Sequence, residues 1–122
     1  MPPTFAELGV PADLVAVLDR RGITTPFPIQ AATLPDTLAG RDISGRAPTG
    51  SGKTLAFGLP LVLNVTAARP GRPTGLVLVP TRELAEQVRR ELAPLASATG
   101  RRVMAIYGGV GYGPQRNALD RG

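Results

Sequence analysis

The loop Ala47-Pro48-Thr49-Gly50-Ser51-Gly52-Lys53-Thr54 sets two glycines beside a lysine and a hydroxyl residue. Lys53 is the only lysine in the chain, and all the other cationic residues are arginines. The small residues let backbone N–H groups close around phosphate oxygens, and a following helix points its positive end at them. Lys53 can then reach the β and γ oxygens, and the Thr54 hydroxyl can ligate Mg²⁺. The loop therefore predicts a site for a nucleoside triphosphate and its metal ion.

The composition is typical of one globular domain. With 122 residues, of which 43% are hydrophobic and 19% charged, the chain can bury a core and is not of the disordered type. It has no cysteine and no histidine, which excludes disulfides, thiolate chemistry and the most common metal ligand and general base. The formal charge of +5 suits a polyanionic partner, and a solvated basic surface explains it equally well.

Neither membrane insertion nor export is predicted. The longest apolar stretch, residues 55–63, is too short to span a bilayer. The first five residues lack the charged and then apolar design of a signal peptide. We therefore expect a cytoplasmic protein with no membrane partner.

Helical and apolar segments alternate along the chain. Helices are expected at 11–21, 28–38, 53–64 and 82–93, and a last short helix is expected to open at Pro114. Pro94 should bend or end the fourth helix, on which Glu86 and Arg90 are spaced as an ion pair. Strands are expected around Ile43, at 102–107, and at 76–79, the last of them buried on both faces. The alternation predicts an α/β fold with a parallel sheet and flanking helices, which places ligands beyond the carboxyl ends of its strands.

Four motifs, in order, resemble those of DEAD-box ATP-dependent RNA helicases. The phosphate loop follows the family variant A-x-T-G-x-G-K-T, with Ala47 at its first position. Residues 22–30 (GITTPFPIQ) resemble the adenine-recognition motif, and Phe5 stands seventeen residues before Gly22, at the family spacing. Residues 80–85 (PTRELA) match the next motif, and residues 107–109 (YGG) resemble the glycine pair that follows it. Phe27 departs from the family, which commonly has threonine at that position.

The resemblance implies a partial RecA-like phosphate-loop domain and a role for individual residues. Phe5 would pack against the adenine ring, and the Gln30 carboxamide would hydrogen-bond its edge. The phosphates of ATP and the Mg²⁺ ion would be held by Thr49, Gly50, Ser51, Gly52, Lys53 and Thr54, with Lys53 and Thr54 as the catalytic candidates. The RNA backbone would run along Pro80, Thr81, Arg82, Gly108 and Gly109.

The family also uses parts that these 122 residues do not contain. No two of the nine acidic residues are adjacent, so the acidic D-E-A-D box is missing, as are a later Ser-Ala-Thr motif and a second domain with arginine fingers. We interpret residues 1–122 as the N-terminal portion of a helicase ATP-binding domain, with an adenine-recognition region at 1–40 and a phosphate-loop core at 41–122. This portion should bind nucleotide and RNA and turn ATP over poorly without the C-terminal half. An uncovered strand edge favours either self-association or marginal stability.

Two other interpretations stay open at this point. The chain can belong to another phosphate-loop ATPase that acts on DNA, although the matches at Phe5, Gln30 and residues 80–85 count against this. It can also be a non-catalytic RNA-binding or interaction module. The complete Gly52-Lys53-Thr54 triplet argues against a vestigial nucleotide site, whereas the missing acidic motif favours a non-catalytic role.

Overall fold

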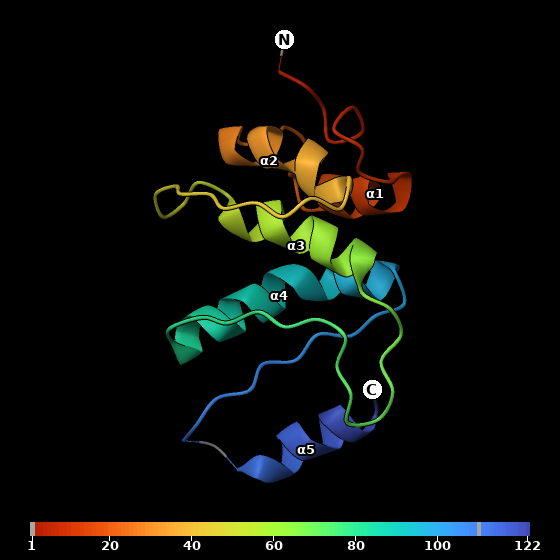
Figure 1. Cartoon of the computed structure of the whole chain (residues 1–122), viewed down its shortest axis with the longest axis vertical. Coiled ribbons are helices and arrows are strands. Elements are labelled where there is room, and N and C mark those ends of the chain that lie inside the picture. The colour runs from red at the N-terminus through yellow and green to blue at the C-terminus, as the bar shows by residue number, and fades with distance from the viewer. Residues whose placement is uncertain (1, 110) are drawn as a thin grey trace. The chain divides into compact units, whose positions relative to one another are not determined.

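The computed structural model describes residues 2–109 and 111–122 and contains five helices within them (Figure 1). Two compact units divide the chain, residues 1–63 and residues 64–122, and each is described by itself. Over the part of the chain that the structure describes, no helix combines the length and apolar character needed to cross a membrane.

The first unit is built from α1 (Ala12–Arg20), α2 (Pro28–Leu38) and α3 (Lys53–Asn64), the last residue of α3 belonging to the second unit. Leu14 and Leu18, one turn apart on α1, are completely buried because this spacing puts them on one face of the helix. Leu34 of α2 and Leu59 of α3 are buried as well. The three helices agree with the predicted ranges to within one residue at each end.

The second unit contains α4 (Arg82–Ala98) and α5 (Tyr112–Asp120). The Thr81 hydroxyl caps α4 by accepting a hydrogen bond of 3.1 Å from the backbone N–H of Leu84. The prediction that α4 ends near residue 93 is wrong, because the helix continues through Pro94 for four more residues. Leu95 and Ala96 are buried in this last turn, so their burial offsets the loss of one backbone hydrogen bond at the proline.

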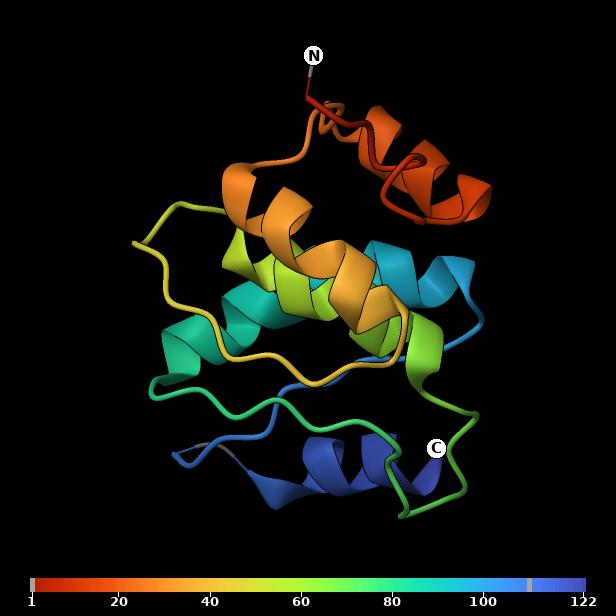
Figure 2. The same ribbon diagram turned by 45° about the horizontal axis from the view of Figure 1, so that its top comes forward.

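Extended segments replace the predicted strands. Residues 65–80 and 101–109 run between α4 and α5 in both ribbon views (Figures 1 and 2), and no strand ladder forms within residues 2–109 and 111–122. Among the residues that the structure describes, one isolated antiparallel bridge joins Arg69 to Arg72. The expected burial of 76–79 on both faces is also wrong, since Leu76 is 77% exposed and Leu78 is 84% exposed. An apolar extended segment becomes a sheet strand only when neighbours take up its backbone hydrogen bonds and cover both faces.

Candidate functional site

The phosphate loop turns sharply at two glycines of the first unit. Gly50 has a φ of +82° and Gly52 a φ of +84°, a left-handed conformation that side chains with a Cβ rarely adopt. Between them, the backbone N–H of Ser51 donates to the Pro48 carbonyl at 3.2 Å. Helix α3 begins directly afterwards at Lys53. The order of glycine turn and helix start is that predicted from the sequence, and it presents the positive end of α3 at the loop.

Gln30 ties the start of α2 to this loop. Its Oε1 accepts a hydrogen bond of 2.9 Å from the backbone N–H of Phe27, and its Nε2 donates to the Gly52 carbonyl at 3.0 Å. The side chain is only 2% exposed. Both ends of the carboxamide therefore already have protein partners. The predicted contact of Gln30 with an adenine edge would have to be added to these two bonds or replace one of them.

The two phenylalanines of the recognition region lie in different surroundings. Phe5 is buried in the core of the first unit, whereas Phe27 is 51% exposed. Phe27 lines an open hollow of about 550 Å³ together with Pro28, Ile29 and Ala32 on one side and with Arg46, Ala47, Pro48, Gly50 and Ser51 of the loop on the other. Sequence reasoning missed Phe27 as a site residue, although its departure from the family pattern singles it out. The exposed ring beside the phosphate loop is an apolar surface suited to a base.

The loop also fits the phosphate group that the sequence predicts. Among the described residues, the Ser51 hydroxyl oxygen is a buried polar atom without a hydrogen-bond partner. Lys53 is exposed, while Thr54 is half-buried in the first turn of α3. A buried hydroxyl, an exposed ammonium and a helix N-terminus together suit the oxygens of a bound phosphate.

In the second unit, Arg82 lies beside the glycine pair. Gly109 has a φ of +85°, and a Cβ built on it would lie 3.1 Å from a guanidinium nitrogen of Arg82. The exposed residues Pro80, Thr81 and Gly108 complete the set predicted to follow a nucleic-acid backbone. The fold thus brings Arg82 and Gly109 together, although they are far apart in the sequence, while the Thr81 hydroxyl is used as the cap of α4.

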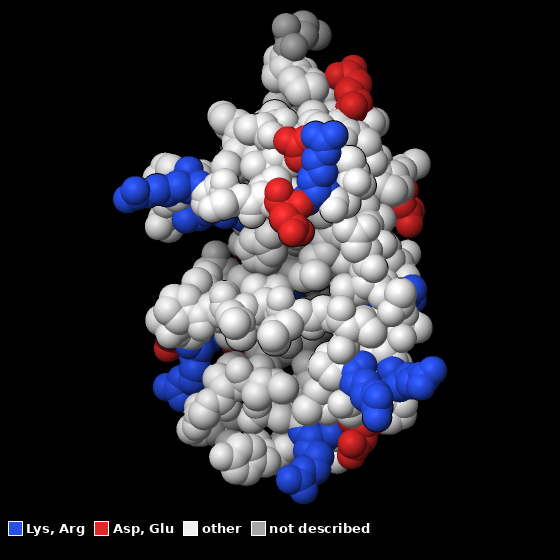
Figure 3. Space-filling view, viewed as in Figure 1, with Lys and Arg blue, Asp and Glu red and all other residues white. Residues whose placement is uncertain are grey.

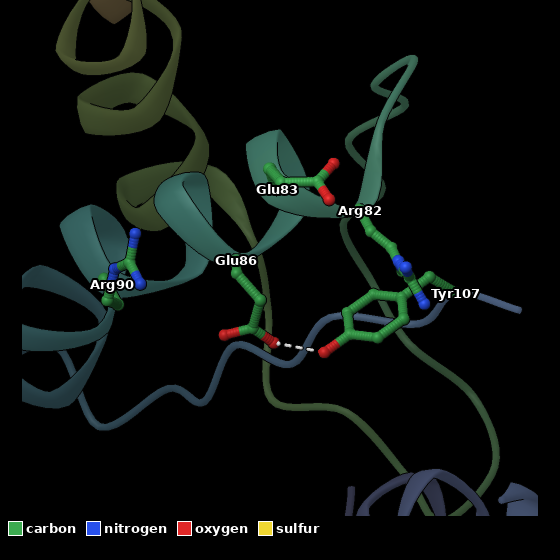
Figure 4. Close-up of a pocket in the computed structure, with 5 residues that line it drawn as sticks. All are labelled: Arg82, Glu83, Glu86, Arg90 and Tyr107. Atoms are coloured by element: carbon green, nitrogen blue, oxygen red, sulfur yellow. Dashed lines mark hydrogen bonds between the residues drawn. The ribbon is translucent and has the colours of Figure 1, made fainter. Parts of the chain in front are cut away.

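Tyr107 and α4 enclose a second hollow of about 420 Å³, lined by Arg82, Glu83, Glu86, Arg90 and Tyr107. Figure 4 shows the Tyr107 hydroxyl directed at Glu86, to whose Oε1 it donates a hydrogen bond of 3.0 Å. The predicted ion pair between Glu86 and Arg90 is wrong, because Glu86 pairs with Arg89 at 2.9 Å instead. Spacings of three and four residues both bring side chains together on a helix, and only the packed structure selects one.

These contacts shift the pKa of both partners in opposite directions. The pKa of Glu86 is lowered, chiefly by the hydrogen bond from Arg89 and next by the one from Tyr107. The pKa of Tyr107 is raised, chiefly because its hydroxyl donates to the Glu86 carboxylate, while the charge of Arg82 opposes this shift. Glu86 is therefore held as an anion and Tyr107 as a neutral donor.

The Glu86–Tyr107 contact is expected to weaken at both extremes of pH. The contribution of Glu86 to stability is present above the unfolded pKa of the carboxyl group, about 4.3, and is lost as the pH falls through the lower folded value. The contribution of Tyr107 is present below its unfolded pKa, about 10, and is lost as the pH rises through the higher folded value. Urea unfolding of the wild type and of Tyr107→Phe across this range should show a stability difference that shrinks at both ends. A difference that is constant with pH would contradict this expectation.

The net positive charge of the chain lies in the second unit. Residues 64–122 hold nine arginines and four acidic residues, a net charge of +5, whereas residues 1–63 hold five residues of each sign. On the face shown in Figure 3, several basic side chains lie over the α5 end of the second unit. The second unit therefore has a net charge that suits a nucleic-acid backbone, whereas the charges of the first unit cancel.

Comparison with known proteins decides the family. Residues 27–122 match the family model for DEAD/DEAH box helicases. The chain belongs to this family. It is 50% identical over 125 aligned residues to "DEAD-box ATP-dependent RNA helicase 3A, chloroplastic" from Zea mays, a match that covers 97% of the chain and 16% of that relative. It is 42% identical to "ATP-dependent RNA helicase RhlB" from Sodalis glossinidius, with 97% of the chain and 30% of that relative covered. The chain therefore spans less than a third of the length of these helicases.

Two solved structures of related proteins share the fold. The chain superposes on the RNA helicase Prp28 from Chaetomium thermophilum bound to ADP with a TM-score of 0.81 at 38% identity, covering 95% of the chain and 29% of that structure. A DEAD box protein from Methanococcus jannaschii gives a TM-score of 0.79 at 33% identity, with 96% and 32% covered. The predicted RecA-like α/β class is thus confirmed at the level of the fold, whereas the parallel sheet is not seen within the described residues.

Proposed function

We propose that residues 1–122 form the ATP-binding part of an ATP-dependent RNA helicase, in which binding and hydrolysis of ATP drive RNA unwinding. The observation that supports this most directly is the phosphate loop, whose two left-handed glycines lead into α3 at Lys53. The structural relative Prp28 was solved bound to ADP. The proposal keeps the predicted organisation, an adenine-recognition region at 1–40 and a phosphate-loop core at 41–122.

In the nucleotide site, Thr49, Gly50, Ser51 and Gly52 surround the phosphates, and the exposed ammonium of Lys53 neutralises their charge. The Thr54 hydroxyl is the protein ligand that we assign to Mg²⁺, which supplies charge neutralisation when it is bound. We assign Phe5 and Gln30 to the adenine, as the sequence predicts, and Phe27 adds an exposed ring beside the phosphate loop.

In the RNA site, Pro80, Thr81, Arg82, Gly108 and Gly109 follow the phosphate backbone. Arg82 supports this role because its guanidinium lies beside Gly109, so that a cation is next to the glycine backbone. The positive charge of residues 64–122 would attract RNA without reading its sequence. We also propose that a C-terminal helicase part completes catalysis, that residues 1–122 self-associate, and that the protein is cytoplasmic.

Calorimetric titration with ADP and with GDP, each with Mg²⁺, tests the nucleotide site. We expect ADP to bind and to be preferred over GDP, because the region around Phe5, Gln30 and Phe27 would recognise the base. In Lys53→Ala, the affinity for ADP should fall by about tenfold or more, since a charge-assisted contact of about 1.5–3 kcal/mol is removed. Arg41→Ala is the control, because it removes a cation from the same unit but outside the loop.

Each outcome of this titration separates one part of the proposal from another. Equal binding of ADP and GDP would leave a phosphate loop without base recognition. Binding that Lys53→Ala does not weaken would contradict the phosphate loop itself. Absence of ADP binding in wild-type protein that unfolds cooperatively would argue against nucleotide binding by residues 1–122.

A further inference from the structure

Tyr107 is held at its backbone and at its side chain by two other residues. The Oε1 atom of Gln115 accepts a hydrogen bond of 3.2 Å from the Tyr107 N–H, and its Nε2 donates to the Tyr107 carbonyl at 3.4 Å. At the other end of the residue, the hydroxyl donates to Glu86 on α4 at 3.0 Å (Figure 4). Tyr107 is therefore fixed from α5 on one side and from α4 on the other.

The Gln115 carboxamide forms hydrogen bonds to the Tyr107 backbone like those that a neighbouring strand would form. A carboxamide carries one N–H donor group and one carbonyl acceptor, the same pair that a backbone peptide group offers in a sheet. By bonding both backbone groups of Tyr107, it satisfies them in a segment for which no strand ladder forms among the described residues. The Nε2 atom of Gln115 also donates to the Gly111 carbonyl at 3.2 Å, so it ties both sides of the glycine pair to α5.

The residues next to Tyr107 are those that we assign to the RNA backbone. Gly108 and Gly109 follow directly, and Gly109 lies beside the Arg82 guanidinium. Glycines restrict the backbone less than any other residue, so their position depends on what holds the residues that flank them. The hydrogen bonds to Tyr107 supply that restraint. Glu86 lies one turn after Arg82 on α4, so the same helix holds both Tyr107 and the arginine next to Gly109.

We propose that Gln115 and Glu86 are positioning residues that hold the Gly108–Gly109 backbone beside Arg82 for contact with the phosphates of an RNA strand. Neither residue touches the RNA in this arrangement, and both act through Tyr107. This inference rests on the proposed RNA site at Pro80, Thr81, Arg82, Gly108 and Gly109. Its consequence is that loss of either attachment should weaken RNA binding without removing any cation.

The proposal can be tested with residues 1–122 and a fluorescein-labelled ten-nucleotide oligouridylate, with the affinity measured by fluorescence anisotropy at several salt concentrations. Gln115→Ala removes the two bonds to the Tyr107 backbone and the bond to the Gly111 carbonyl, and Tyr107→Phe removes only the hydroxyl. Asn117→Ala and Tyr112→Phe are matched controls, because they delete an exposed carboxamide and an exposed hydroxyl from the same helix, α5. Circular dichroism and thermal melting check that each variant is folded.

We expect Gln115→Ala and Tyr107→Phe to weaken binding by about two- to tenfold, in line with the value of single hydrogen bonds, and the two controls to bind like wild type. The slope of log K against log salt should become shallower by about 0.7 for each phosphate contact that is lost. A role in overall stability alone would change the melting temperature and leave this slope unaltered. In a Glu86→Ala background, Tyr107→Phe should have no further effect, because its partner is already gone.

Arg82→Ala separates failure of this inference from failure of the RNA site. If Arg82→Ala lowers affinity and slope while Gln115→Ala and Tyr107→Phe match wild type, the positioning role is wrong and the RNA site stands. If Arg82→Ala changes neither quantity, the RNA site itself is wrong, and the positioning role is overturned with it.

Discussion

Alanine in place of Gly52 should lower the affinity for ADP by about 30-fold or more, which corresponds to about 2 kcal/mol. The first reason is the backbone, because a φ of +84° costs a residue with a Cβ about 1–2 kcal/mol. The second is space, because the new methyl group would overlap the Gln30 Nε2 atom and lie 2.6 Å from a ring carbon of Phe27. It would therefore displace the carboxamide that holds the Gly52 carbonyl.

Gly50→Ala is the matched control for this prediction. Gly50 has nearly the same φ, +82°, but a Cβ on it would have no atom within 4 Å. It should cost only the backbone strain, about 1–2 kcal/mol, and so affect binding less than Gly52→Ala does. Calorimetric titration with ADP and thermal melting of both variants measure the difference. Equal effects of the two substitutions would show that contact with Gln30 and Phe27 does not constrain the loop.

Replacement of Gln30 should have the second large effect, on stability as well as on binding. Gln30→Met keeps the length of the side chain but leaves the Phe27 N–H and the Gly52 carbonyl without their partner. Each such group left unsatisfied costs about 1–3 kcal/mol, so the loss of two partners should lower the free energy of unfolding by about 2–6 kcal/mol. Urea unfolding measures this loss. Gln87→Met is the control, because Gln87 is exposed and its carboxamide contacts only Glu91 among the bonds described, so it should change stability by less than about 0.5 kcal/mol.

Gln30→Glu tests the two bonds separately. The introduced carboxylate can still accept from the Phe27 N–H, but it would repel the Gly52 carbonyl and be buried, which raises its folded pKa above the unfolded value. A raised folded pKa means that the protonated variant is the more stable one, and that stability is lost as the pH rises through this value. The variant should therefore be closest to wild type at low pH. A stability difference that does not grow between pH 4 and pH 8 would contradict the bond to Gly52.

The local structure of the motifs was predictable from the sequence, because it depends on the backbone preferences of residues that are near one another in the chain. The phosphate loop places glycines where the backbone turns left-handed, and the start of α3 at Lys53 follows from that turn. The range of α1 follows from the spacing of Leu14 and Leu18, and the start of α2 follows from Pro28 in its first turn. The extent of α4 was not predictable in this way, because burial of Leu95 and Ala96 outweighs the local effect of Pro94.

The sequence alone determined the family, the phosphate loop and the ranges of α1, α2 and α3, since these depend on residue types at short and fixed spacings. Only the tertiary structure determined which hydrogen-bond or ion-pair partner each of these polar side chains has. It turned Gln30 toward Gly52, paired Glu86 with Arg89 and Tyr107, and set Gln115 against the Tyr107 backbone. It also left residues 76–79 extended with two leucines exposed. The physical reason is that hydrogen bonds and burial join residues far apart in the chain, and their geometry exists only after the helices have packed.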